Sequence, residues 1–211
     1  MRPTRLLMVF SWLLLTASVA FFIYALTRAV KPAEEPLSVY GTVSDSFRLT
    51  NQWGETVSLD DLKGKVWIAY FFFSTCPSIC PVMNRNMTDV QLEFAKNPNV
   101  VIVGFTVDPK TDTPEVLRRY GEKWGVQRGK WHYLTGDKEV IYRVARNSFK
   151  LGVSPAPPEQ QGGEHDFIHS EKFVLVDRKG QIRGYYNGVD KNEVQRLMQD
   201  VYRVLQENGA Q

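Results

Sequence analysis

Residues 66–81 read VWIAYFFFSTCPSICP, an apolar run followed by two cysteines that are separated by three residues. A second apolar run, VVIVGFTV, occupies residues 100–107. Uninterrupted apolar runs of this length are typical of parallel strands that are covered on both faces of a sheet. Between the two runs, residues 81–96 carry apolar side chains at roughly helical spacing. The stretch therefore predicts a right-handed β-α-β unit.

The segments on either side extend this unit. Local patterns predict hairpins at residues 47–59 and 173–186 and a short strand at 131–134. They also predict three helices: one that starts at Asp112 or Thr113, a short one at 138–147 and an amphipathic one at 190–206. A long irregular stretch, residues 151–166, interrupts this order. The pattern predicts an α/β, thioredoxin-like fold over residues 46–211, with an N-terminal hairpin and an inserted loop.

The N-terminal segment has a different character. Residues 6–27 contain no charged side chain, and as a helix they would extend roughly 33 Å, enough to cross a hydrocarbon core. A cleaved signal peptide is the alternative, because Ser18-Val19-Ala20 resembles a cleavage site. Since the apolar run continues beyond Ala20, we favour a transmembrane anchor, preceded by a short cytoplasmic N-terminus (1–5) and followed by a Pro-containing linker (28–45).

The charge distribution argues against a nucleic-acid partner. Four of the 26 Lys and Arg residues precede the first acidic residue, Glu34, which leaves 22 basic against 23 acidic residues in the remainder. Phosphate binding needs a concentrated excess of basic side chains. An N-terminus of five residues before the apolar run has no room for an organelle transit peptide. These features favour a single-pass protein of a bacterial inner membrane.

Cys76 and Cys80 are the only cysteines of the chain, and they lie between the first predicted parallel strand and its helix. Open α/β sheets bind ligands at this edge. Pro81 suits a first helical turn, so Cys80 is expected at or near the N-cap, where the helix dipole favours thiolates. Buried inert cysteines and a redox-active Cys76–Cys80 disulfide are the alternatives, although thioredoxin-type redox motifs have two intervening residues.

Two thiolates form a soft site that suits Cu(I), and an imidazole would complete a trigonal arrangement. His169 directly precedes the predicted strand at 173–176, so we take it as the third ligand, with His165 as the alternative. His132 is interpreted as a packed or surface residue of a strand. Met83 and Met87 fit core packing better than copper transfer.

The residues quoted above resemble the Sco/SenC copper proteins of cytochrome oxidase assembly. The resemblance is carried by the segments FSTCPSICP (73–81), VDPKTDTPEVL (107–117) and IHS (168–170). It implies an N-terminal anchor, a domain that faces the periplasm or intermembrane space, and copper bound by Cys76, Cys80 and His169. It also implies delivery of copper to the dinuclear copper centre of the oxidase, or reduction of that centre's cysteines beforehand.

Asp108 follows the second parallel strand, and the resemblance makes it a possible accessory residue for Cu(II) or for partner docking; a carboxylate that only stabilises its own turn is the alternative. Three functions stay open. A copper chaperone, which would not be an enzyme, is favoured over a thiol–disulfide oxidoreductase or redox sensor and over a structural zinc module. The expected partners are the copper-bearing subunit of cytochrome c oxidase, other copper chaperones and thioredoxin-like reductases.

Overall fold

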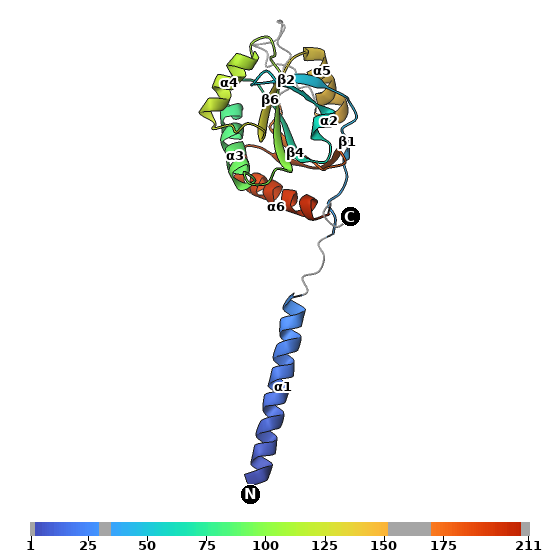
Figure 1. Cartoon of the computed structure of the whole chain (residues 1–211), viewed down its shortest axis with the longest axis vertical. Helices are drawn as coiled ribbons and strands as arrows, with labels where there is room; N and C mark the ends of the chain where they lie inside the picture. The colour runs from blue at the N-terminus through green and yellow to red at the C-terminus, as the bar shows by residue number, and fades with distance from the viewer. Residues whose placement is uncertain (1–2, 30–34, 152–169, 208–211) are drawn as a thin grey trace. The chain divides into compact units, whose positions relative to one another are not determined.

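The computed structural model describes residues 3–29, 35–151 and 170–207 (Figure 1). The chain divides into two compact units, with the boundary between Glu35 and Pro36. In the first unit, helix α1 (Pro3–Ala29) contains the whole apolar segment 6–27. Among the described residues, no helix meets the combined requirements of length and apolarity for crossing a membrane. The transmembrane role of this segment therefore stays a prediction.

The second unit is built on one mixed sheet whose strands follow the order β1-β8-β7-β4-β5-β6-β2-β3. Strands β4, β5 and β6 are parallel to one another, and β7 and β8 form an antiparallel hairpin beside β4. The strands are β1 (Gly41–Thr42), β2 (Arg48–Asn51), β3 (Thr56–Ser58), β4 (Val66–Phe72), β5 (Val100–Thr106), β6 (Trp131–Thr135), β7 (Lys172–Val176) and β8 (Gln181–Asn187).

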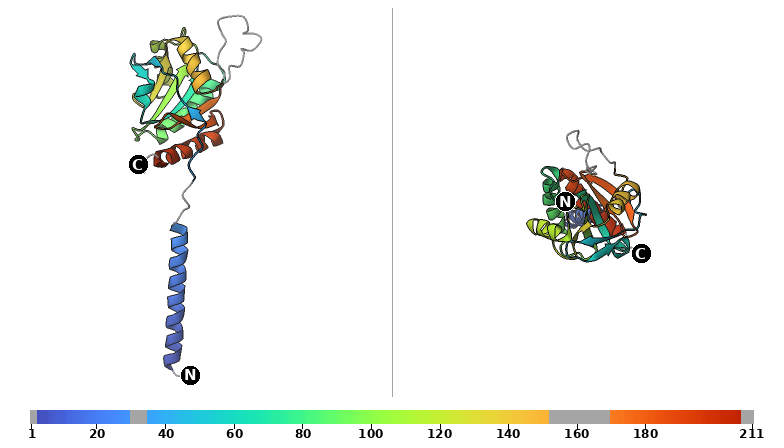
Figure 2. Two further views of the ribbon diagram at one scale, coloured as in Figure 1. Left: turned by 90° about the vertical axis from the view of Figure 1, so that its right-hand side faces the viewer. Right: turned by 90° about the horizontal axis from the view of Figure 1, so that it is seen from above.

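Helices cover both faces of this sheet, as Figures 1 and 2 show. Every residue of β4 is buried, and its side chains alternate between two hydrophobic cores because successive strand residues point to opposite faces. Ile68, Tyr70 and Phe72 pack with α3, α4 and α6. Trp67 and Phe71 pack on the opposite face, with α5. The helices are α2 (Leu59–Leu62), α3 (Ile79–Glu93), α4 (Pro114–Lys123), α5 (Lys138–Arg143), a π-helical segment (Val144–Ser148) and α6 (Lys191–Glu207).

The predicted α/β fold with a central β-α-β unit and two hairpins is confirmed, and three details are corrected. The linker predicted to end at residue 45 is too long, because Pro36 already belongs to the folded unit and β1 pairs with β8. Helix α3 begins at Ile79, so Cys80 lies inside its first turn. The helix predicted at 138–147 changes from α to π at Val144.

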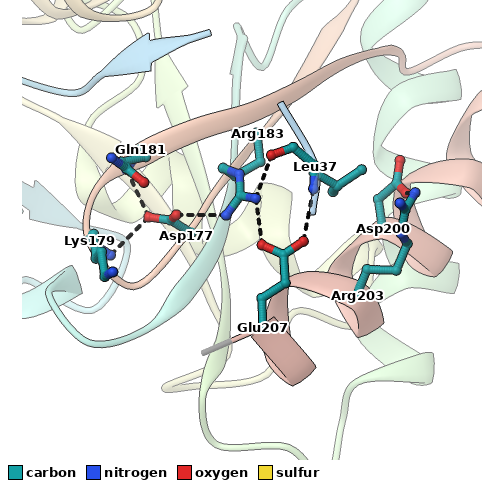
Figure 3. Close-up of polar contacts among 8 residues, drawn as sticks. All are labelled: Leu37, Asp177, Lys179, Gln181, Arg183, Asp200, Arg203 and Glu207. Carbon is teal, nitrogen blue, oxygen red and sulfur yellow. Dashed lines mark hydrogen bonds and ion pairs between the residues drawn. The ribbon is translucent and has the colours of Figure 1, made fainter. Parts of the chain in front are cut away.

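A buried arginine explains why the folded unit begins at Pro36, ten residues before its predicted start. Arg183 in β8 donates to Asp177 (3.0 Å), to the carbonyl of Leu37 (2.6 Å) and to Glu207 at the end of α6 (Figure 3). The N–H of Leu37 in turn donates to Glu207 at 2.9 Å. The two ends of the folded unit are therefore joined through one guanidinium group, which sequence patterns did not indicate.

Candidate metal centre

The two cysteines lie where β4 gives way to α3, on the face of the sheet that α3, α4 and α6 cover. Ser78 is the N-cap residue, and Cys80 and Pro81 occupy the first turn of α3. Pro81 fits there because the first N–H groups of a helix have no intrahelical acceptor. Both sulfurs are free thiols, and Cys76 and Cys80 are only 8% and 3% exposed.

The two thiols have opposite electrostatic environments. A hydrogen bond from the Cys80 thiol lowers the pKa of Cys76; the backbone N–H groups of Cys80 and Ser78 lower it further, against an opposing effect of burial. The same thiol–thiol hydrogen bond, together with burial, raises the pKa of Cys80. These environments favour the thiolate form at Cys76 and the protonated form at Cys80. Donors at the N-terminus of α3 stabilise the thiolate, as they stabilise anions at helix N-termini in general.

A buried amide links the first turn of α3 to the surrounding elements. Asn84 is fully buried, and its Nδ2 donates to the carbonyl of Cys80 at 2.8 Å and to the Tyr120 hydroxyl at 3.0 Å. Its Oδ1 accepts from the hydroxyls of Tyr70 (2.8 Å) and Tyr133 (2.6 Å). These rings have room because the neighbouring β5 position is Gly104, where a Cβ would lie 3.0 Å from ring atoms of Tyr70 and Tyr133.

Asp112 contacts the cysteine loop, which is residues 73–78 between β4 and α3. It is fully buried and accepts hydrogen bonds from the Ser74 N–H (3.1 Å), from the Ser74 hydroxyl and from the Thr106 hydroxyl. Burial raises the pKa of Asp112, although the hydrogen bonds to Ser74 and Thr106 act in the opposite direction. Of the two residues at which this helix was predicted to start, Thr113 and not Asp112 is the N-cap residue of α4, and its side chain accepts from the Val116 N–H.

Asp108 leaves the same edge of the sheet as Cys76, because the Val107 N–H donates to the Phe72 carbonyl at 2.9 Å. Asp108 is only partly buried, and its Oδ1 accepts from the Thr111 N–H at 3.4 Å. Its carboxylate therefore stabilises its own turn while it remains at the edge that carries the cysteines. This position is compatible with both the accessory and the turn-stabilising interpretation.

The histidines differ in how far the structure describes them. His165 and His169 lie outside the described residues, so the predicted third ligand is not seen. His132 is half-buried in β6, with Nδ1 3.2 Å from Asn51 Nδ2 and its ring edge-on to Trp53. Burial lowers the pKa of His132. The interpretation of His132 as a packed residue is confirmed.

The described residues provide two sulfur ligands and no larger set: they contain no group of three His, Cys, Asp or Glu residues arranged to hold a metal ion. Two adjacent thiols, one of them favoured as a thiolate, suit a soft metal ion such as Cu(I). Met83 and Met87 are fully buried, which confirms their assignment to the core.

Sequence analysis missed two residues that support the pair, Asn84 and Tyr120. Asn84 had a local signal, because it is a polar residue on the same face of α3 as Cys80 and Met87. Tyr120 had none, since it comes from α4 and meets Asn84 only in the folded chain.

Comparison with known proteins gives a consistent result. The sequence model of the SCO1/SenC family matches residues 38–206. A SCO1 protein homolog of Bacillus subtilis is 38% identical over 159 residues, which cover 74% of this chain and 80% of the relative.

Two solved structures share the fold. The structure of BsSco, described as a member of the Sco family of cytochrome c oxidase assembly proteins with a disulfide switch, has a TM-score of 0.68 at 34% identity and covers 81% of this chain and 98% of BsSco. The copper-bound structure of Bradyrhizobium japonicum ScoI has a TM-score of 0.62 at 25% identity, covering 77% of this chain and 99% of ScoI. Both matches support the thioredoxin-like arrangement.

Proposed function

This chain belongs to the SCO1/SenC family, and on that premise we propose that it binds one copper ion through Cys76, Cys80 and His169 for the assembly of cytochrome c oxidase. The observation that carries the proposal is the pair of free, buried cysteines at the N-terminus of α3. Thiolates are soft ligands that select Cu(I). The relatives support copper in particular, because ScoI has been solved with copper bound.

The sheet register supports His169 as the third ligand. Strand β7 runs antiparallel to β4, and Ala69 pairs with Val174. Because the two strands are antiparallel, β7 begins at the end of the sheet where β4 ends and the cysteine loop follows. His169 precedes Lys172, the first residue of β7, by three positions in the sequence. A neutral imidazole at this edge would complete a three-coordinate site, with Asp108 as an accessory group for Cu(II).

The proposed setting is a bacterial inner membrane, with residues 6–27 of α1 as a single anchor and the folded unit on the periplasmic side. The copper-bearing subunit of the oxidase is the proposed recipient. Other copper chaperones and thioredoxin-like reductases are the proposed sources of copper and of reducing equivalents, because only the reduced pair can supply thiolate ligands to copper.

Thiol–disulfide exchange is the second candidate, because Cys76 is favoured as a thiolate and Cys80 lies beside it as the second thiol. In that reaction the Cys76 thiolate attacks a substrate disulfide and releases one substrate thiolate. The Cys80 sulfur, on losing its proton, then displaces the second substrate sulfur. Two electrons pass to the substrate as the Cys76–Cys80 disulfide forms. The disulfide switch described for BsSco gives this candidate independent support.

The substitution His169→Ala separates the two candidates, because copper coordination needs the imidazole and thiol exchange does not. If copper transfer is the main function, we expect cells with His169→Ala to contain oxidase that lacks copper, while the purified variant still reduces a model disulfide. The matched control is His132→Ala, which removes an imidazole far from the motif; its oxidase should keep its copper. Protein abundance is checked by immunoblot.

The outcomes are distinct. Normal copper content of the oxidase in His169→Ala cells would contradict copper transfer and favour the oxidoreductase. Loss of both copper and disulfide reduction in Cys76→Ser and Cys80→Ser is expected for either candidate and serves as the positive control.

A further inference from the structure

A buried amide is bonded to the chain on both sides of Cys76. Asn84 in α3 is fully buried, and its Nδ2 donates to the carbonyl of Cys80 at 2.8 Å. Its Oδ1 accepts from the hydroxyl of Tyr70 in β4, also at 2.8 Å. Tyr70 precedes Cys76 in the sequence, and Cys80 follows it. Residues 70–80, which contain both cysteines, are therefore closed into a loop by the side chain of Asn84.

The other hydrogen bonds of this amide hold it in place. Its second Nδ2 proton is donated to the hydroxyl of Tyr120 in α4 at 3.0 Å, and its Oδ1 also accepts from the hydroxyl of Tyr133 in β6 at 2.6 Å. An amide has two donor and two acceptor positions, so all four are occupied. A fully satisfied polar cluster in an apolar core makes its surroundings rigid. The Cys80 backbone is therefore restrained relative to β4, β6 and α4.

This restraint bears on the chemistry of the cysteines, because a disulfide or a shared metal ion needs both sulfurs at once. A disulfide forms only when the two Cα atoms lie within a narrow range of separations. Either product therefore costs the conformational entropy of the segment that joins the two residues. A segment that the fold already restrains loses less entropy on reaction, which is the general benefit of preorganisation. Asn84 supplies such a restraint without contacting the reacting atoms in the printed sequence of hydrogen bonds from Tyr70 to Cys80.

We propose that Asn84 is a positioning residue of the thiol pair: it restrains residues 70–80 and so favours both the Cys76–Cys80 disulfide and a metal ion shared by the two sulfurs. The inference rests on the proposed function and names a further residue of the same site. Groups outside the ligand set commonly adjust metal affinity in this way, by orienting the ligands.

The test compares Asn84→Leu with Gln91→Leu in the full chain. Gln91 is the matched control, because it is a second buried amide of α3. It donates to the carbonyl of Gly125 and accepts from the N–H of Gln127, two groups that lie far from the cysteines in sequence. A milder variant, Tyr133→Phe, removes one donor to Asn84 and keeps both the ring and the bond to Cys80. It keeps the test open if Asn84→Leu does not fold.

Two equilibrium constants are measured. Glutathione disulfide oxidises the metal-free pair: one S–S bond forms between Cys76 and Cys80, and two molecules of glutathione are released. We expect the constant of this reaction to fall by up to about 10-fold in Asn84→Leu. The Cu(I) affinity, from competition with a chromophoric chelator, should fall by about 10- to 100-fold. Tyr133→Phe should shift both constants in the same direction by a smaller factor, and Gln91→Leu should match the wild type.

The outcomes separate the two levels of the argument. Unchanged constants in Asn84→Leu would overturn the role of Asn84. Equal losses in Gln91→Leu would overturn it too, because they would show a general loosening of α3. A wild-type protein that binds no stoichiometric copper would refute the proposed function instead. The glutathione equilibrium needs no copper, so it still tests Asn84 in that case.

Discussion

The two thiols of the candidate metal centre differ in their environments although they are only four residues apart in sequence. Cys76 accepts from the Cys80 thiol and from the N–H groups of Ser78 and Cys80, whereas Cys80 acts as donor to Cys76. We therefore predict that Cys76 is the more reactive thiol of the pair.

This asymmetry predicts different rates of alkylation. Because the hydrogen bond from Cys80 lowers the pKa of Cys76, its thiolate persists as the pH falls below the ordinary thiol value of about 8.5. We expect iodoacetamide to modify Cys76 before Cys80 at neutral and mildly acidic pH, as measured by mass spectrometry of peptides. In Cys80→Ala the main cause of the shift is gone, so the midpoint of the rate profile should move to higher pH. Equal rates at the two cysteines would refute the assignment.

At the scale of the elements, Asp112 joins the cysteine loop to β5. Its carboxylate accepts from Ser74 in the loop and from Thr106 at the end of β5, and these residues lie 38 and 6 positions away in sequence. The loop thereby has a fixed attachment on its N-terminal side, while Asn84 fixes the first turn of α3 on the other side. The cysteines lie between these two attachments in the sequence.

The buried carboxyl predicts a pH-dependent stability. Burial raises the folded-state pKa of Asp112 above its unfolded-state value, so the folded state holds this proton more tightly than the unfolded state does. The resulting stabilisation is present below the unfolded pKa of about 3.9 and is lost as the pH rises through the folded pKa. Asp112→Asn has no such proton. Its free energy of unfolding should therefore increase relative to that of the wild type as the pH rises from the unfolded-state pKa to the folded-state pKa of Asp112. Urea unfolding at a series of pH values measures the difference; parallel profiles would contradict the prediction.

At the scale of the whole folded unit, Arg183 connects β8, the start of the unit and the end of α6 (Figure 3). The guanidinium is 6% exposed and Asp177 is 1% exposed. A buried ion pair contributes uncertain net stability, but removing one partner leaves an uncompensated buried charge. The segment that follows residue 35 is therefore part of the fold rather than a free linker.

We expect Arg183→Met to lower the free energy of unfolding by about 3–5 kcal/mol, because the carboxylates of Asp177 and Glu207 lose the guanidinium that pairs with them. The control is Arg128→Met, which breaks an exposed ion pair with Glu55 and should cost less than about 1 kcal/mol. Urea unfolding of both variants measures the two losses. A small loss in Arg183→Met would show that water or another cation compensates the carboxylates.

Local sequence patterns predicted the central strands, the hairpins and the position of the thiol pair. The apolar runs at 66–73 and 100–107 predicted two central strands, because strands covered on both faces are apolar throughout. Pro81 located the thiol pair near a helix N-terminus, since proline is favoured in the first turn of a helix. Both hairpins followed from alternating side chains around turn residues.

The tertiary structure alone decided what surrounds that pair. Asn84 meets Tyr120 across 36 positions and Tyr133 across 49, while Leu37 meets Arg183 across 146. Periodicity reports which face of an element is buried, but it carries no information on which distant polar group will satisfy a buried one. That choice depends on how the helices pack over the sheet, because a buried donor or acceptor must find its partner among the groups that packing brings within reach.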